Sequence, residues 1–262
     1  MTVNPQPAAI TGTFAICPGT SATLSSATAG GTWSSSNTAV ADFAVATSGT
    51  IDGLSAGTTL VSYTAPVTGC VRSATLTVNP VPASIAGTLV VCPGATSSLS
   101  TTSTGGAWSS STPAVATVAF STGVVTAVSA GTSVITYRFS STGCYTTAVF
   151  TVNPTPGPIS APSNVCVGSS ATYTSVGGAT WSSSSPAIGS INATTGVFDG
   201  LSVGTTTITY QTVNGCIATK LVSVNTTPSP LTGTMVVCEG ASTNLTAVPG
   251  GGTWSSSNTG IA

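Results

Sequence analysis

Short stretches of the chain alternate apolar and polar residues, and the same stretches return at intervals. In TTLVSY, residues 58–63, Val61 and Tyr63 fall on one face. In TLTVN, residues 75–79, Leu76 and Val78 do the same. A period of two is typical of β-strands with one buried face. Gly, Pro, Asn and Ser separate the stretches every ~8–12 residues, so the pattern predicts an all-β fold built of antiparallel β-sandwiches.

Four tryptophans mark an internal repeat with spacings of 75, 73 and 73 residues. Each follows a glycine pair and precedes at least three serines; they are Trp33, Trp108, Trp181 and Trp254. The alternating stretch recurs with its aromatic residue as Tyr63, Tyr137 and Tyr210. Ig-type sandwiches bury a tryptophan at a similar place near a disulfide, so we expect these tryptophans and tyrosines in successive cores. Exposed tryptophans that stack on sugars are the alternative.

The repeat divides the chain into an array of Ig-like domains. Proline-containing linkers separate them, and the predicted boundaries are 1–5 (the end of a preceding closing strand), 6–80, 81–154, 155–227 and 228–262. The last segment is the first half of a fourth repeat. Met1 falls on an inward position of a closing strand, so we expect both ends of the chain to be cut from a longer array. Another chain that supplies the missing strands is the alternative.

Charged residues are scarce, at 3% of the chain against roughly 25% in typical proteins. Serine and threonine make up about a third of the sequence. Three scattered cations and a net charge of −1 exclude a basic nucleic-acid footprint. No apolar run approaches the ~18 residues of a membrane helix, so we expect no membrane insertion. Charges normally keep edge strands apart, and their scarcity favours association with identical or neighbouring repeats.

The sequence offers nothing for catalysis or metal binding. It lacks histidine, and its four acidic residues lie singly. Acid–base catalysis needs a titratable group poised near its working pH, and calcium needs several carboxylates. We therefore predict no enzyme, no cofactor and no metal site.

Seven cysteines form two series along the repeats. The early series, in contexts such as ICPG and VCEG, is Cys17, Cys92, Cys166 and Cys238. The late series, always after glycine, is Cys70, Cys144 and Cys216. One disulfide within each repeat is the simplest pairing, which predicts Cys17–Cys70, Cys92–Cys144 and Cys166–Cys216 and leaves Cys238 without a partner. Pairing between molecules remains the alternative, chiefly for Cys238. Disulfides imply an extracellular, oxidising environment.

The repeat resembles the bacterial Ig-like domains of group 2, which occur in tandem in intimin- and invasin-type adhesins and in giant surface proteins. The segments WSSSNTAVA (33–41), GLSAGTTLVSY (53–63) and TLTVN (75–79) carry the resemblance and recur in every full repeat. The cysteine pair and the Ser/Thr-rich composition are similar to those of secreted proteins from Bacteroidetes-type bacteria. The resemblance implies a stalk or spacer and supplies no catalytic residues.

Together these features predict a segment of an extracellular structural protein, either a surface stalk or a self-associating filament with a mechanical role. The alternative is an adhesin module that binds a glycan or a host surface ligand directly. In either case we expect Trp33 to pack beneath the disulfide of its own repeat.

Overall fold

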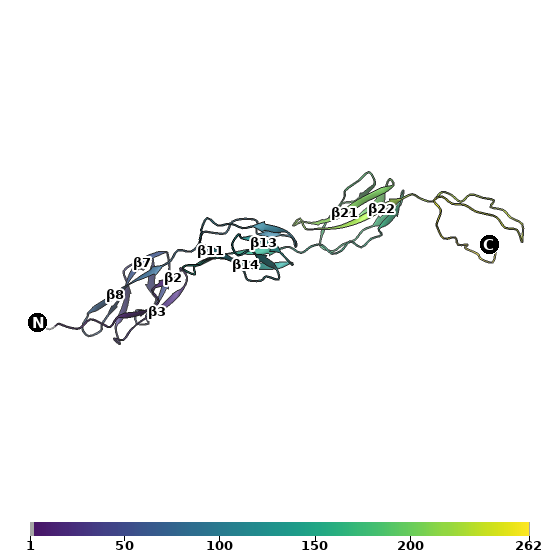
Figure 1. Ribbon diagram of the computed structural model, residues 1–262. Helices are drawn as coiled ribbons and strands as arrows, with labels where there is room; N and C mark the ends of the chain where they lie inside the picture. Colours follow the sequence, from purple (N-terminus) through teal and green to yellow (C-terminus); the bar gives the residue numbers. More distant parts are fainter. Residues whose placement is uncertain (1–2, 262) are drawn as a thin grey trace. The chain divides into compact units, whose positions relative to one another are not determined.

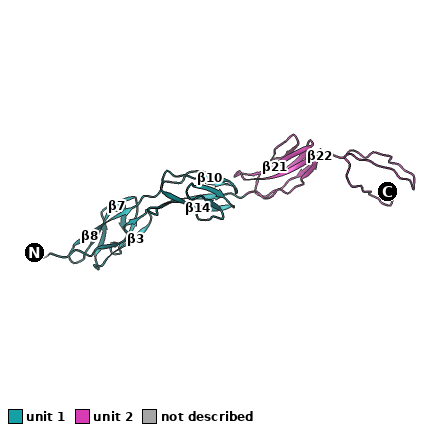
Figure 2. Cartoon of the chain, in the orientation of Figure 1, with its two compact units in different colours: residues 1–154 teal, residues 155–262 magenta. Residues whose placement is uncertain are grey.

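The computed structural model describes residues 3–261, so the predictions about Met1 and Ala262 lie outside the described residues. The regular secondary structure in this range consists of β-strands and includes no helix, so the all-β prediction is confirmed. No described helix is long and apolar enough to cross a membrane. The chain forms two compact units, residues 1–154 and 155–262 (Figure 2).

The first unit begins with a two-sheet sandwich (Figure 1). One sheet has the order β1-β3-β6-β5 and the other the order β2-β8-β7-β4. The strands of the first sheet are β1 (Ile10–Gly12), β3 (Ser21–Ser26), β6 (Thr50–Gly53) and β5 (Ala41–Phe43). Those of the second are β2 (Ala15–Ile16), β8 (Val71–Val78), β7 (Gly57–Thr64) and β4 (Thr32–Ser35). All pairs are antiparallel except β2 with β8.

Both sheets contribute to the core between them. Leu24 and Ile51 come from the first sheet, while Trp33, Val61 and Leu76 come from the second. Alternate residues along β7 are buried, as the period of two predicts. Each fully buried side chain of this size stabilises the fold by ~1.5–3 kcal/mol.

A second sandwich completes the first unit. One sheet has the order β10-β13-β12 and the other the order β11-β14-β15-β9. Its strands are β9 (Val90–Val91), β10 (Thr96–Ser98), β11 (Gly106–Ser110), β12 (Ala116–Val118), β13 (Val124–Ala127), β14 (Gly131–Phe139) and β15 (Tyr145–Val152). Its core contains Trp108 and Tyr137 at the positions of Trp33 and Tyr63.

The second unit holds a third sandwich, with sheets of order β16-β22-β21-β18 and β17-β20-β19. Its strands are β16 (Asn164–Cys166), β17 (Ser170–Thr172), β18 (Ala179–Ser183), β19 (Gly189–Ile191), β20 (Val197–Gly200), β21 (Gly204–Thr212) and β22 (Ile217–Asn225). Trp181 and Tyr210 lie in its core. We refer to the three sandwiches as repeats 1, 2 and 3; the exact domain boundaries stay a prediction.

Residues 228–261 differ from the rest, because this described segment contains no strand. The one β-bridge of this described segment joins Thr232 and Thr246. Trp254 is 58% exposed, so the prediction that it lies in a core is wrong. No described strand pairs with its segment in the way that β7 pairs with β4, and its indole is therefore left uncovered.

Candidate functional site

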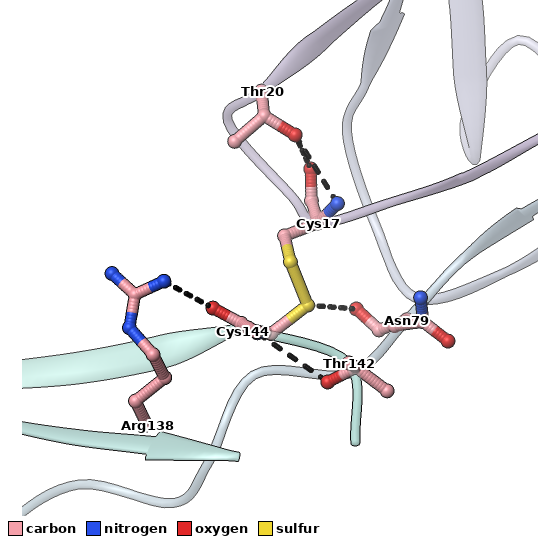
Figure 3. The surroundings of a disulfide bond; sticks show 7 residues. Cys17, Thr20, Asn79, Arg138, Thr142 and Cys144 are labelled. Atoms are coloured by element: carbon pink, nitrogen blue, oxygen red, sulfur yellow. Dashed lines mark hydrogen bonds between the residues drawn. A yellow bond between two sulfur atoms is a disulfide. The ribbon is translucent and has the colours of Figure 1, made fainter. Parts of the chain in front are cut away.

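The first unit carries a disulfide between its two sandwiches, which joins Cys17 of repeat 1 to Cys144 of repeat 2 (Figure 3). The two Cα atoms are 5.5 Å apart, within the usual range for a disulfide. The bond closes a loop with a sequence separation of 127 residues. In the chain-entropy model a loop of this size constrains the unfolded chain by ~5 kcal/mol.

The predicted pair Cys17–Cys70 is wrong because of the strand register within repeat 1. Ile16 pairs in parallel with Val78 at the end of β8, so Cys17 lies where the chain leaves the repeat. Cys70 directly precedes β8 and therefore lies at the opposite end of the same sheet. Eight residues of strand separate the two ends by about 25 Å. A disulfide needs Cα atoms within ~7 Å, so the two cysteines cannot meet.

The other two predicted pairs are wrong as well. Cys144 bonds to Cys17 and is therefore not the partner of Cys92. Cys216 is disulfide-bonded, whereas Cys166 is a free thiol. Cys92 is also disulfide-bonded. The remaining free thiols among the described residues are Cys70, which is partly buried, and Cys238, which is exposed.

A tight turn holds Cys17 at the edge of repeat 1. The Thr20 hydroxyl accepts a hydrogen bond from the Cys17 amide at 3.1 Å and donates one to the Cys17 carbonyl at 2.8 Å. The Gly19 amide donates to the Gly53 carbonyl at 2.8 Å, which ties the turn to β6. Gly19 has a φ of 76°, a conformation that glycine adopts without steric cost. The Cys-Pro-Gly-Thr sequence thus presents the Cys17 side chain from a fixed backbone.

A hairpin between β14 and β15 holds Cys144. The Thr142 hydroxyl accepts a hydrogen bond from the Cys144 amide at 3.3 Å, and the Phe139 amide donates to the Cys144 carbonyl at 2.9 Å. The linker between the repeats lies against the sulfur, with the Asn79 carbonyl oxygen 3.8 Å from the Cys144 sulfur (Figure 3). A disulfide sulfur carries no proton, so this is a contact and not a hydrogen bond. Cys144 is fully buried.

The tryptophan clusters lie inside the sandwiches. The Trp33 ring lies 4.7 Å from the Tyr63 ring and 5.6 Å from the Phe43 ring, measured between centroids. Gly49, with a φ of 70°, packs against the indole, and a Cβ there would lie 3.2 Å from the Trp33 Nε1 atom. Trp33 therefore packs against aromatic side chains and a glycine turn. The prediction that it lies beneath a disulfide of its own repeat is wrong, because repeat 1 has no internal disulfide.

The tyrosine hydroxyls fasten the loop that leads into each tryptophan strand. Tyr63 donates to the Thr28 carbonyl and accepts a hydrogen bond from the Gly31 amide. A Cβ on Gly31 would lie 2.5 Å from the Tyr63 ring, so the glycine allows this close approach. Tyr137 and Tyr210 accept the equivalent amide hydrogen bonds from Gly106 and Ala179.

The serines after Trp33 have a structural role that was not predicted from the sequence. Thr59 is a buried hydroxyl on β7 that binds Ser35 at 2.8 Å and accepts a hydrogen bond from the Asn37 amide at 3.0 Å. Ser36 in turn accepts a hydrogen bond from the Leu60 amide at 3.0 Å. The hydroxyl cluster therefore anchors the turn after β4 onto β7.

The same hydroxyl cluster occurs in the other two sandwiches. Its buried members are Ser133 in repeat 2 and Thr206 in repeat 3. Each lies 2.8 Å from the equivalent serine hydroxyl, that of Ser110 or Ser183. A signal was present in the sequence, since each strand carries Ser or Thr two residues before its buried Val or Ile.

The described residues contain no group of three or more His, Cys, Asp or Glu side chains that could hold a metal ion. Trp33, Trp108 and Trp181 are between 5% and 6% exposed, so a sugar cannot stack on them. The junction of Cys17, Cys144 and Asn79 is the site whose chemistry distinguishes this chain.

No protein-family model and no curated protein sequence matches the chain. Similar solved structures include a C-terminal 282-residue fragment of intimin, solved with the intimin-binding domain of its translocated receptor. It is 16% identical, with 59% of this chain and 67% of that chain covered and a TM-score of 0.40. Invasin, a bacterial integrin-binding protein, is 13% identical, with coverages of 85% and 61% and a TM-score of 0.40.

Domains 1–6 of the surface layer protein SbsC are 16% identical to the chain, with a TM-score of 0.26. The match covers 88% of this chain and 42% of that protein, so the chain spans less than half of it. With identities of 16% or less and TM-scores of 0.40 or less, these likenesses support no further statement about this chain.

Proposed function

We propose that the chain is a segment of an extracellular structural protein, a tandem Ig-like surface stalk or filament whose role is mechanical. The observation that carries the proposal is the Cys17–Cys144 bond, which joins one sandwich covalently to the next. The finer assignments belong to the same proposal: group 2 bacterial Ig-like repeats, a Bacteroidetes-type source and domains at 6–80, 81–154 and 155–227.

The bond changes what a pulling force can do to the chain. Because the sulfurs of Cys17 and Cys144 are bonded, residues 17 and 144 cannot move apart when the chain is pulled. Residues 18–143 hold most of repeat 1 and most of repeat 2, and the bond withholds the length that their unfolding would otherwise add between residues 17 and 144. A separation of 127 residues corresponds to about 430 Å of extended chain that the bond withholds. The junction therefore limits extension under load.

The disulfides also indicate where the protein works. Cytosolic reductants keep thiols reduced, whereas disulfides persist in oxidising compartments and outside the cell. Four of the seven cysteines are disulfide-bonded. An extracellular location at the cell surface is consistent with this chemistry.

The sheet edges support self-association as a further part of the role. The chain has seven charged residues, and of these only Asp42 lies in an edge strand of the described sheets. The edge strands β4, β11 and β18 carry serine and no charge. Edge strands normally use charge to prevent pairing with other chains, so these edges present little repulsion to an identical or neighbouring repeat.

Direct glycan binding is the rival function, and the buried tryptophans of repeats 1–3 weigh against it. A glycan or surface ligand would have to bind other groups. No residue cluster in the described part of the chain favours a particular ligand, and we therefore keep the structural role as the proposal.

Single-molecule stretching tests the proposal. The oxidised chain, pulled from its two ends, should reach a fully extended length at least about 430 Å shorter than the same chain after reduction with a phosphine. The Cys238→Ser variant is the matched control, because it removes a free thiol and should not change the oxidised length. Equal lengths before and after reduction would refute the mechanical role.

A further inference from the structure

We propose that the disulfides of this chain follow one rule: the early cysteine of one repeat bonds to the late cysteine of the next repeat. We call this pairing the stagger. By this rule Cys70 and Cys166 are each one half of a further junction, with the thiol still free. Each is built to bond the complementary cysteine of another Ig-like repeat joined in tandem. This goes beyond the mechanical role, because it concerns which cysteines pair and holds whether or not the chain carries force.

The surroundings of Cys70 match those of the bonded Cys144. The Cys70 amide donates to the Thr68 hydroxyl at 3.3 Å, and the Cys144 amide donates to the Thr142 hydroxyl at the same distance. The Cys70 carbonyl accepts from the Ala65 amide at 2.9 Å, as the Cys144 carbonyl accepts from its own hairpin partner. The two hairpins are therefore the same structure, one with a bond and one without.

The linker that precedes each repeat also occupies the same place. The Cys70 sulfur lies 3.9 Å from the Asn4 carbonyl oxygen, and the Cys144 sulfur lies 3.8 Å from that of Asn79. Both asparagines belong to the sequence Thr-Val-Asn-Pro. Cys144 is fully buried beside repeat 1, whereas Cys70 is only partly buried. The difference is the cover that a preceding repeat supplies.

Cys166 matches the other half of the junction. The Ser169 amide donates to the Cys166 carbonyl at 3.0 Å, as the Thr20 amide does to the Cys17 carbonyl at 3.2 Å. The Gly168 amide donates to the Gly200 carbonyl at 2.8 Å, the distance found between Gly19 and Gly53. Cys166 thus sits in the turn that presents Cys17 to its partner, and its thiol is free.

The spacing of the cysteines supports the stagger. From each late cysteine to the next early one there are 22 positions, in Cys70–Cys92, Cys144–Cys166 and Cys216–Cys238. The distance from early to late within a repeat varies, at 53, 52 and 50. The constant segment is the closing strand with its proline linker, which sets the span from one junction to the next.

The proposed bond requires an oxidant. Two thiols lose their two protons and two electrons as the sulfur–sulfur bond forms. A disulfide oxidant, such as oxidised glutathione or a disulfide oxidoreductase, accepts them and is reduced to two thiols. The full chain with its Cys17–Cys144 bond already formed can undergo this step at Cys70, since that thiol is free.

An extended chain tests the proposal. Residues 1–80 are placed before residues 6–262, which adds one copy of repeat 1 through the same Thr-Val-Asn-Pro linker. The added copy carries Ala15→Ser and Val67→Ile, two exposed positions near Cys17 and Cys70, so that its cysteine peptides differ in mass from the original ones. After oxidation with oxidised glutathione, non-reducing peptide mapping should link the Cys17 of the added copy to the original Cys70. The original Cys17–Cys144 bond should remain. Maleimide should label Cys70 in the unextended chain and label it at least ten-fold less in the extended one.

The control replaces Cys17 by serine in the added copy alone, which should restore full labelling of the original Cys70. An added copy that closes Cys17 onto its own Cys70 would overturn the proposal. So would an original Cys70 that stays reactive, or loss of the Cys17–Cys144 bond in the extended chain. A reactive Cys70 with Cys17–Cys144 intact would leave the mechanical role standing, so the two failures are distinguishable.

Discussion

The segments 31–41 and 252–261 have nearly the same sequence and different surroundings. Both contain Gly-Thr-Trp-Ser-Ser-Ser-Asn. Trp33 is 6% exposed, packed against Tyr63 and beside a turn fastened to Thr59. Trp254 is 58% exposed, and no described strand covers it. The motif therefore does not make a core by itself, because the strand that buries its tryptophan comes later in the repeat.

The cysteines extend this lesson from the strand to the repeat. Cys144 and Cys70 sit in identical hairpins, yet Cys144 is bonded and buried while Cys70 is free and partly exposed. What differs is the neighbour, since Cys144 has repeat 1 beside it. Local sequence sets the shape of each half of the junction, and the adjacent repeat completes it.

The largest expected effect comes from removing the tryptophan in each segment. Trp33→Ala should lower the free energy of unfolding by ~3–5 kcal/mol, because it leaves a cavity between the sheets. Trp254→Ala should change it by less than ~0.5 kcal/mol, as expected for a surface substitution. Chemical denaturation of both variants measures the difference. Equal losses would mean that Trp254 is buried as Trp33 is.

The glycine turn beneath Trp33 gives a smaller effect. In Gly49→Ala the new Cβ would lie 2.3 Å from the Leu24 carbonyl oxygen and 3.2 Å from the Trp33 indole nitrogen. The left-handed backbone alone costs ~1–2 kcal/mol, and the clash should add to it. Gly19→Ala is the matched control, since Gly19 is also left-handed but has nothing within 4 Å. A loss in thermal stability no greater than in the control would show that the turn is free to move away from the indole.

Removing the buried hydroxyl of Thr59 should lower the free energy of unfolding by less than the Gly49 substitution does. Thr59→Val keeps the shape of the side chain but removes the buried hydroxyl that binds the Asn37 amide and Ser35, which should cost ~1–3 kcal/mol. Thr58→Val, at the exposed neighbouring position, should be close to neutral. Ser256→Ala tests the same motif in the segment without a strand and should also be close to neutral. Urea unfolding that ranks the three variants differently would contradict the anchoring role of Thr59.

The smallest effect is a pH dependence confined to repeat 3. Tyr173 occupies the position of Leu24 and Leu99, and burial raises the pKa of its hydroxyl. The neutral phenol is therefore favoured in the folded state. Its contribution is fully present below the unfolded pKa of ~10 and is lost as the pH rises toward the folded pKa. Thermal unfolding of the native chain should weaken more between about pH 9 and pH 11 than that of Tyr173→Leu. Parallel curves would mean that Tyr173 ionises freely in the fold.

The sequence predicted the parts of the fold that depend on local pattern. The period of two along residues 58–63 and 75–79 located strands that the structure confirms, because side-chain alternation is a property of the strand itself. The repeat also placed Trp33, Trp108 and Trp181 at equivalent positions, and all three are buried.

The pairing of the cysteines could not be read from the same pattern. Counting one early and one late cysteine per repeat does not say at which end of the sandwich each lies. That depends on the parallel pairing of the two-residue strand β2 with β8, a short element that carries no periodic signal. Likewise, the role of the serines after Trp33 could not be predicted, because their partner Thr59 lies on a strand more than twenty residues away.

Non-reducing peptide mapping of the oxidised chain tests the central claim most directly. Proteolysis without reduction, followed by mass spectrometry, should yield a cross-linked species that joins the peptide of Cys17 to that of Cys144, with Cys70 recovered as a free thiol. A species that joins the peptide of Cys17 to that of Cys70 would contradict a bond between repeats and return each disulfide to its own sandwich.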